Sequence, residues 1–395
     1  MKLRRFTVVA VTAAAVAATL NVVPASAGHN TKPADQSLRA LAARHNLYIG
    51  TAVDSAALND PADPQYRQLV AKEFNTVTAE NVMKWESLEP TRGQYNWAPA
   101  DELIEFARKN KQLVRGHVLV WNNQLPAWLT EGVADGSISK TELRQILQNH
   151  ITTVVKHFKG KIWQWDVVNE AASDPWDSPS TIHYKGFWAQ NLGEGYVADA
   201  FRWARAADPK ALLFYNDYNL EAFGDRGPSD KVQFVYNMVK NLKAAGVPID
   251  GVGSQGHLGT QYGNYDVFQV SDTLKAFTDL GLATAFTEVD VRSHTANIAD
   301  SNELNPRLQA SAYNHGVLLQ ACLSNPKCLS FTLWGVSDNH SWVPTWFDDP
   351  PEGLATVYDE NYQPKKAYFE LKGDLLFSGP PYVLPRVTQK PNKGR

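Results

Sequence analysis

The segment Trp163-Gln-Trp-Asp-Val-Val-Asn-Glu170 decides the fold prediction for this chain. Its run of apolar residues predicts a strand that is buried on both faces, as strands of parallel sheets are. Asn169 and Glu170 follow at the carboxyl end of this strand, where barrels and open α/β sheets build their active sites. A second strand of the same kind, residues 282–288, also ends on a glutamate, Glu288. Two glutamates at the rim of one parallel sheet are the groups that glycoside hydrolysis requires.

The first 27 residues predict a secretory signal peptide that takes no part in the fold. A basic start over residues 2–5 precedes an Ala/Val-rich run over residues 6–20, and Ala25-Ser-Ala27 offers a small-residue cleavage site. The apolar run is too short for a membrane span. Its paired arginines leave both the general and the twin-arginine export routes open. We therefore expect a secreted, extracellular protein without membrane contact after signal removal, whose mature chain begins near Gly28.

From residue 36 onward, short β-like runs alternate with amphipathic helical runs. The expected strands are 47–53, 76–79, 113–121, 163–170, 211–215, 250–254, 282–288 and 329–333, and the expected helices are 36–45, 64–72, 98–110, 140–158, 195–207, 229–245, 267–281, 306–323 and 366–377. Such alternation implies parallel strands with helical crossovers, and eight units favour a closed (β/α)8 TIM barrel over residues 28–377. An open doubly wound sheet is the alternative, but no glycine-rich phosphate-binding motif follows the first strand. Residues 378–395, with repeated proline and a basic end, predict a flexible tail.

The composition limits the classes of partner. A net charge of −3 at pH 7 gives no basic surface for nucleic acid or anionic lipid. The twelve tryptophans and fifteen tyrosines are more informative, because many of them lie beside polar residues at predicted strand ends. There an aromatic ring can stack on the face of a sugar. No metal cluster or cofactor motif is evident in the sequence, so we expect neither, and we expect the protein to be a monomer.

The only cysteines are Cys322 and Cys328, separated by five residues. In an exported protein, a close pair across a turn predicts a structural disulfide. Closing so short a loop stabilises the fold by roughly 2 kcal/mol in the chain-entropy model. Metal ligation is the alternative, but no second Cys/His pair with zinc spacing accompanies the first.

Polar and aromatic residues recur at the carboxyl ends of the predicted strands. The segments concerned are Thr78-Ala-Glu-Asn-Val-Met-Lys-Trp85, Gly116-His-Val-Leu-Val-Trp121, Trp165-Asp-Val-Val-Asn-Glu170, Asn216-Asp-Tyr-Asn219, Gly253-Ser-Gln-Gly-His257, Thr287-Glu-Val-Asp290 and Leu333-Trp-Gly-Val-Ser-Asp-Asn-His-Ser-Trp342. Together they resemble glycoside hydrolase family 10, the retaining endo-β-1,4-xylanases, in the same order and over residues 47 to about 372. The resemblance implies a TIM barrel that cleaves xylan or xylo-oligosaccharides by double displacement.

By this resemblance, Glu170 is the acid/base and Glu288 is the nucleophile. A retaining mechanism needs the two carboxyl groups about 5.5 Å apart, so that one attacks the anomeric carbon while the other protonates the leaving oxygen. Asn169 then corresponds to the residue that bonds the sugar 2-hydroxyl. His257 corresponds to the histidine that orients the nucleophile, and we count both His257 and its strand-end neighbour Gln255 among the substrate-binding residues.

The resemblance also implies sugar contacts at the other strand ends. The non-reducing side is matched by Glu80, Asn81, Lys84 and Gln124, the aromatic walls by Trp121, Trp334 and Trp342, the cleavage subsite by His117, and the leaving-group side by Tyr218. Purely structural histidines are the alternative for His117 and His257. A buried ion pair between Glu80 and Lys84 that supports the barrel is the alternative on the non-reducing side.

Two features depart from the family pattern. Asn122 stands where the family usually has a histidine, and residues 174–192 replace a commoner Asp-rich stretch. Because this loop follows the acid/base strand, we expect it to shape the leaving-group side. Cleavage of another β-linked plant glycoside, such as a saponin of the tomatine type, is therefore an alternative activity. A non-catalytic sugar-binding barrel is a third hypothesis, which the two retained glutamates disfavour.

Overall fold

The computed structural model describes residues 35–175, 181–222, 229–296, 298 and 301–379. The predicted signal peptide and nearly all of the predicted tail lie outside these residues, so both stay predictions. From Gln36 onward the chain forms one compact unit. Within the described part, no helix is both long and apolar enough to cross a membrane.

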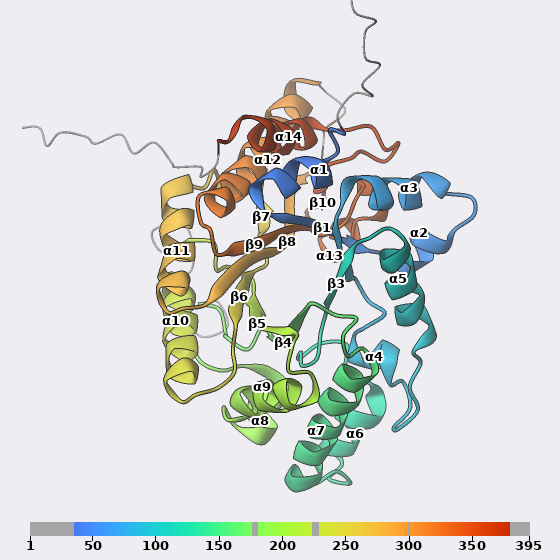
Figure 1. The fold of residues 1–395 in the computed structure, drawn as a ribbon, viewed down its shortest axis with the longest axis vertical. Helices are drawn as coiled ribbons and strands as arrows, with labels where there is room; N and C mark the ends of the chain where they lie inside the picture. Colours follow the sequence, from blue (N-terminus) through green and yellow to red (C-terminus); the bar gives the residue numbers. More distant parts are fainter. Residues whose placement is uncertain (1–34, 176–180, 223–228, 297, 299–300, 380–395) are drawn as a thin grey trace, which may run out of the picture. The chain divides into compact units, whose positions relative to one another are not determined.

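Eight of the described strands are parallel and close into a barrel (Figure 1). In barrel order they are β1 (Tyr48–Val53), β2 (Thr76–Ala79), β3 (Leu113–Gly116), β4 (Gln164–Asn169), β5 (Leu212–Asp217), β6 (Gly251–Ser254), β8 (Ala283–His294) and β9 (Cys328–Leu333). The barrel closes where β9 pairs with β1, with Ser330 opposite Tyr48. The predicted TIM barrel is thus confirmed, and the open sheet is excluded.

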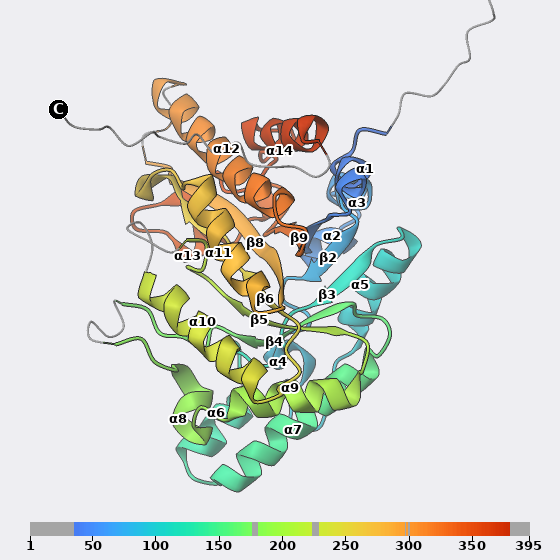
Figure 2. The same cartoon turned by 60° about the vertical axis from the view of Figure 1, so that its left-hand side comes forward.

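Helices follow the strands and surround them (Figures 1 and 2). They are α1 (Leu38–Ala42), α2 (Ser55–Asn59), α3 (Pro64–Glu73), α4 (Trp85–Leu88), α5 (Ala98–Lys109), α6 (Ala127–Ala134), α7 (Lys140–His157), α8 (Gly186–Leu192), α9 (Tyr196–Ala207), α10 (Ser229–Ala244), α11 (Val267–Asp279), α12 (Ser301–Leu323), α13 (Val343–Trp346) and α14 (Lys366–Phe377). Short 3-10 turns occur at Ala43–His45, Thr260–Tyr262 and Asp338–His340. The two short strands β7 (His257–Gly259) and β10 (Glu352–Gly353) pair with the outer part of β8.

Helix α7 shows how the sequence produces these elements. The Ser139 hydroxyl accepts a hydrogen bond from the Glu142 N–H and caps the first turn. Apolar residues then recur at three- and four-residue spacing and form the buried face of the helix: Leu143, Ile146, Leu147, Ile151, Val154 and Val155. That face covers the barrel, and α7 packs beside α9.

The predicted third strand was wrong at its carboxyl end. Regular pairing of β3 stops at Gly116, not at Trp121. The chain leaves the regular ladder at His117, and beyond that point it contacts β4 through the Leu119 N–H, which donates to the Asp166 carbonyl at 3.0 Å, and through an isolated bridge between Val120 and Val168. The apolar sequence that follows Gly116 suits a buried loop as well as a strand, because periodicity does not separate the two in a short apolar run. His117 therefore lies just beyond the strand, not within it.

Two further boundaries differ from the prediction by five or more residues. Strand β8 runs on to His294, because its outer part pairs with β7 and β10, neither of which was predicted. Helix α12 begins at Ser301, five residues before the predicted start at Pro306. The prediction placed Pro306 at the first helical position, where proline is most common. The structure instead places Pro306 inside the helix, where proline is uncommon because its ring nitrogen has no N–H to donate.

The junction of β3 and β4 is closely packed. The indole of Trp165 is fully buried, and a Cβ at Gly116 would lie 2.2 Å from its ring. Only glycine therefore lets the two strands approach at this level. On another side of the barrel, Cys322 and Cys328 form the predicted disulfide, which joins the end of α12 to the start of β9 with a Cα–Cα distance of 5.2 Å.

Candidate active site

A cleft of about 1490 Å³ lies at the carboxyl ends of the barrel strands. All fourteen residues that the sequence predicts for catalysis or sugar binding line it. They are Glu80, Asn81, Lys84, His117, Trp121, Gln124, Asn169, Glu170, Tyr218, Gln255, His257, Glu288, Trp334 and Trp342. The structure thus brings together side chains from seven strand ends, and their individual contacts indicate what each can do.

Glu170 follows β4 in a constrained backbone conformation. Its φ angle is +55°, in the left-handed region that non-glycine residues seldom adopt. Its backbone N–H donates to the Asn216 carbonyl at 2.9 Å. Its carboxylate oxygen Oε1 accepts hydrogen bonds from Asn169 Nδ2 and Gln255 Nε2, both at 3.0 Å. Strain of this kind concentrates at functional sites, and here it aims the carboxylate into the cleft.

A chain of side-chain amides connects Glu170 to Glu288. Asn216 Nδ2 lies 2.6 Å from Glu288 Oε1 and 2.8 Å from Asn169 Oδ1, and Asn169 donates in turn to Glu170. The Thr287 hydroxyl donates to Asn216 Oδ1 at 2.7 Å, which fixes the orientation of that amide. The two carboxylates are therefore held relative to each other by one hydrogen-bonded chain. Asn216 lies within one of the strand-end motifs, but its sequence context predicted no role for it.

Glu288 is buried beside the basic side chains of His117, His257 and Arg115. His257 Nε2 lies 3.3 Å from Glu288 Oε2, and His117 lies 3.9 Å from Glu288 Oε1. Burial alone would raise the pKa of Glu288, but the field of His117, His257 and Arg115 outweighs it and lowers the pKa to about 2. The side chain is consequently an anion throughout the neutral and mildly acidic range, as a nucleophile must be.

His257 carries the charge that faces Glu288. Its Nδ1 lies 3.0 Å from Asp290 Oδ2. Burial lowers the pKa of an imidazole, but the carboxylates of Asp290 and Glu288 reverse this and raise the pKa of His257 to about 10. Asp290 also accepts a hydrogen bond from Trp342 Nε1 at 2.8 Å. One carboxylate thus links the histidine to the aromatic wall of the cleft.

Arg115 and Asp166 form a buried pair that the sequence analysis missed. They form an ion pair across β3 and β4, and Asp166 Oδ2 also bonds His117 Nδ1 at 2.9 Å. All three side chains are almost fully buried. A charged residue in each of two adjacent apolar strands was the available signal, because a buried charge requires a partner. Asp166 orients His117 toward Glu288.

On the predicted non-reducing side, Lys84 contacts an amide instead of a carboxylate. Lys84 Nζ donates to Asn81 Oδ1 at 2.9 Å, and Asn81 Nδ2 lies 3.5 Å from Glu80 Oε1. The alternative of a direct Glu80–Lys84 ion pair is therefore not what the structure shows. Burial and the nearby Asp54 carboxylate raise the pKa of Glu80 to about 7, although Lys84 opposes the shift. Gln124 Nε2 donates to Glu86 at 2.9 Å.

Three indoles surround the two histidines. The ring of Trp334 lies 5.2 Å from that of His117 and 6.2 Å from that of His257, with both pairs edge to face. Trp342 lies 5.1 Å from His257, and Trp121 lies 6.3 Å from His117. Since all three indoles line the cleft, they offer apolar faces to a sugar that reaches Glu288.

Asn122, one of the two departures from the family pattern, connects the leaving-group loop to the active site. Its Nδ2 lies 3.4 Å from the carbonyl oxygens of both Glu170 and Lys185, and its Oδ1 accepts from the Trp188 N–H at 3.4 Å. Gly186 lies against this side chain, where a Cβ would come within 2.2 Å of the carboxamide. Residues 176–180 of the loop lie outside the described part of the chain. The loop therefore borders the cleft through its second half.

Within the described part of the chain, one group of side chains has metal-ligand spacing. The ligand atoms of His117, Asp166 and Glu288 lie within 4.8 Å of one another. Arg115 already pairs with Asp166, and His257, which carries a positive charge, lies beside Glu288. A metal cation would be repelled by both. We therefore interpret the group as a hydrogen-bonded support for the nucleophile.

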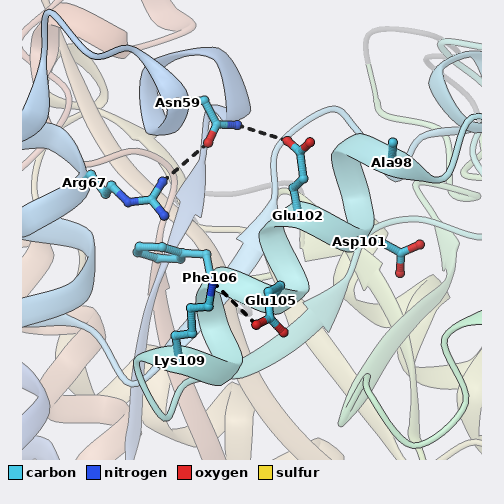
Figure 3. Close-up of a pocket in the computed structure, with 8 residues that line it drawn as sticks. All are labelled: Asn59, Arg67, Ala98, Asp101, Glu102, Glu105, Phe106 and Lys109. Carbon is cyan, nitrogen blue, oxygen red and sulfur yellow. Dashed lines mark hydrogen bonds and ion pairs between the residues drawn. The ribbon is translucent and has the colours of Figure 1, made fainter.

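A smaller pocket of about 480 Å³ lies away from the strand ends, on the outside of α5 (Figure 3). Its polar groups pair with one another: Asn59 contacts both Arg67 and Glu102, and Lys109 pairs with Glu105. The Arg67 guanidinium also covers the ring of Phe106 at 4.7 Å. These mutual contacts leave no group directed at a ligand, so we place the chemistry in the cleft.

Comparisons with known proteins agree with this site. The model of the family described as Glycosyl hydrolase family 10 matches residues 37–373. The chain is 41% identical over 338 residues to endo-1,4-beta-xylanase B of Thermotoga neapolitana, covering 86% of this chain and 91% of that protein. It is 39% identical over 329 residues to endo-1,4-beta-xylanase 2 of Aureobasidium pullulans, covering 81% and 84%. The crystal structure of xylanase 10B from Thermotoga petrophila RKU-1 in complex with xylobiose matches with a TM-score of 0.78 and 39% identity, covering 86% of this chain and 97% of that chain.

Proposed function

Because this chain belongs to glycosyl hydrolase family 10, we propose that it is a retaining endo-β-1,4-xylanase that hydrolyses internal bonds of plant xylan. The observation that carries the proposal is that Glu170, just after β4, and Glu288, within β8, line one cleft. Glu288 is kept ionised by cations, and Glu170 is joined to it through Asn169 and Asn216.

In the first step, Glu288 attacks the anomeric carbon while Glu170 gives its proton to the glycosidic oxygen. The bond to the leaving sugar breaks, and a covalent glycosyl ester forms on Glu288. In the second step, Glu170 removes a proton from water, which displaces Glu288 and restores the β configuration. Asn169, fixed between the two carboxylates, is placed to bond the sugar 2-hydroxyl. That contact strengthens in the transition state.

The remaining cleft residues lie on one or the other side of the glycosidic bond that is cleaved. We assign Glu80, Asn81, Lys84 and Gln124 to the non-reducing side, where their polar groups bond sugar hydroxyls. We assign Tyr218 and the loop that Asn122 anchors to the leaving-group side. Trp334 and Trp342 stand beside the histidines that flank Glu288, so they enclose the sugar that is attacked.

We also propose that the protein is exported and acts as a monomer. The predicted signal peptide over residues 1–27 supports export. All fourteen predicted site residues line one cleft of this chain, so the proposed reaction requires no residue from a second subunit. Export is tested by determining the mature N-terminus, and the oligomeric state by sedimentation of the mature protein. A mature protein that still begins at Met1 would contradict export by signal removal, and a stable dimer in sedimentation would contradict the monomer.

The function is tested by product analysis on xylan, an aryl β-cellobioside and a tomatine-type saponin in parallel. We expect xylan to give xylo-oligosaccharides with β configuration at the new reducing end. Glu288→Ala must lose several orders of magnitude in turnover, and added azide must give an α-glycosyl azide, because azide then attacks from the empty nucleophile side. Cleavage of the saponin alone, or near-normal activity of Glu288→Ala, would contradict the proposal.

A further inference from the structure

A lysine outside the predicted catalytic set lies beneath the leaving-group side of the cleft. Lys231 is the third residue of α10 and is fully buried. Its ammonium lies 3.1 Å from Asp174 Oδ1 and 2.9 Å from Asp217 Oδ1. It also lies over the ring of Tyr218, 3.5 Å from the ring centre. The two carboxylates and the aromatic face together stabilise the charge of this buried ammonium.

Tyr218 is the residue that this lysine reaches from below. Its ring lines the cleft, whereas Lys231 is inaccessible to solvent, so the ammonium occupies the buried side of the ring. The Tyr218 hydroxyl donates to Asp174 and accepts from Lys185 Nζ at 2.7 Å. Its backbone N–H donates to Asp217 Oδ1 at 3.0 Å. Tyr218 is thus held at its ring face by Lys231, at its hydroxyl by Asp174 and Lys185, and at its main chain by Asp217. Both of these aspartates pair with Lys231.

The same lysine is connected to the main chain that follows Glu170. Asp217 Oδ2 accepts a hydrogen bond from the Tyr215 hydroxyl at 2.5 Å, and that hydroxyl accepts from the Ala171 N–H at 3.2 Å. Ala171 is the residue immediately after Glu170. Lys231 therefore supports both the aromatic platform for the departing sugar and the position of the proton donor.

Among the described residues, Lys185 pairs with Asp174, and Lys231 pairs with both Asp174 and Asp217. Burial raises the pKa of Asp174, but Lys231 and the other donors outweigh it and lower that pKa. Removal of the Lys231 charge would leave one buried carboxylate without compensation, which is costly. A test must therefore separate a positioning effect from a loss of folding.

We propose that Lys231 is a positioning residue for the leaving-group side, which fixes Tyr218 and the segment after Glu170 for a sugar in the first subsite beyond the cleaved bond. The inference rests on the proposed xylanase function. It concerns substrates whose leaving group is a sugar, because only these need both the ring of Tyr218 and a well-placed proton donor.

The experiment compares two substrates in Lys231→Met and in the double variant Lys231→Met/Asp217→Asn. The double variant removes the Lys231 cation together with the Asp217 carboxylate, so the net charge of the buried group is unchanged. We expect both variants to lose at least about tenfold in kcat/KM on xylohexaose and less than about threefold on dinitrophenyl β-xylobioside, whose leaving group needs neither protonation nor a sugar platform. The double variant should unfold near the wild-type temperature.

Lys365→Met is the matched control. Lys365 is also a buried lysine paired with an aspartate, Asp338, but it lies at the start of α14. Lys365→Met must change kcat/KM on the two substrates by the same factor. Two results in the stably folded double variant would overturn the inference. One is an equal loss of kcat/KM on xylohexaose and on dinitrophenyl β-xylobioside, and the other is wild-type kcat/KM on xylohexaose. A wild-type enzyme that does not cleave xylohexaose would instead refute the proposed function, which keeps the two failures distinct.

Discussion

Replacement of His257 by asparagine tests the account of the nucleophile. His257→Asn keeps a polar side chain but removes the cation 3.3 Å from Glu288. The fall in the pKa of Glu288 from its usual 4.5 to about 2 corresponds to about 3 kcal/mol of preference for the anion at 1.36 kcal/mol per unit. His117, His257 and Arg115 together stabilise the Glu288 anion, and burial opposes them. Loss of the His257 cation should therefore reduce the stabilisation of the anion by about 1 kcal/mol and raise the pKa of Glu288 by about one unit.

The assay is the acid limb of kcat/KM against pH on an aryl β-xylobioside, because this limb reports ionisation of the nucleophile in the free enzyme. It should move upward by about one unit in His257→Asn. The folded-state pKa of Glu288 lies below its unfolded value, so the stability that this group provides is present above about 4.5 and is lost as the pH falls toward 2. His257→Asn should therefore also weaken the part of acid stability that is lost between those values.

The matched control is His150→Asn. His150 is another buried histidine, but it stacks on Trp85 and bonds Glu89, and it does not line the cleft. Its replacement should lower stability without moving the acid limb. An acid limb that stays in place in His257→Asn, or one that moves equally in both variants, would refute the argument that His257 tunes the nucleophile.

Three further predictions concern other parts of the fold. Burial and Asp54 raise the pKa of Glu80 from 4.5 to about 7, so between these pH values the native state retains a proton that the unfolded state has lost. Stability therefore falls by about 3 kcal/mol as the pH rises through this window. In Glu80→Gln, the free energy of unfolding from urea titrations should differ less between pH 5 and pH 8 than in the wild type. A difference as large as that of the wild type would contradict Glu80 as its origin. Wild type should prefer aryl β-xylobioside to aryl β-cellobioside by about 10- to 200-fold in kcat/KM, and Trp342→Ala should narrow the gap by relieving the clash with the glucose hydroxymethyl group, so parity in the wild type would count against the steric argument. Replacing Cys322 and Cys328 by serine should cost about 2 kcal/mol in unfolding free energy without changing kcat/KM, and an activity loss at temperatures where the variant is folded would show a further role.

Much of the barrel was predictable because two periodicities alternate along the chain. The strand at residues 76–79 and the helix at residues 366–377 have the predicted bounds, and most other predicted elements differ by no more than two residues at either end. The exceptions arise from tertiary pairing. β8 runs past Glu288 because β7 and β10 offer it partners, and such partners leave no local signal in the sequence. β3 ends early because the chain turns at His117 toward Asp166.

The candidate site was predictable only as far as residue types at strand ends allow. The motifs placed Glu170, Glu288 and their neighbours in one cleft, since carboxyl ends of parallel strands share one face of a barrel. They did not show that Asn216 bridges the two sides, because an amide in a polar motif has many possible partners. Nor did they reveal Lys231, which lies in a helix 61 residues after Glu170 and enters the site from beneath. Long-range contacts of this kind follow from the assembled fold alone.

The surroundings of the two glutamates explain why their roles are not interchangeable. A nucleophile must remain ionised at the working pH, and Glu288 has cationic His257 at 3.3 Å and the Arg115–Asp166–His117 group behind it. A group that gives and then takes a proton must not be locked in one charge state. Among the described contacts of the Glu170 carboxylate, the donors are the neutral amides of Asn169 and Gln255, and neither brings a charge to the carboxylate. Moving a cation next to Glu170 would therefore impair proton transfer even if the carboxylate stayed in place, whereas the same cation beside Glu288 supports catalysis.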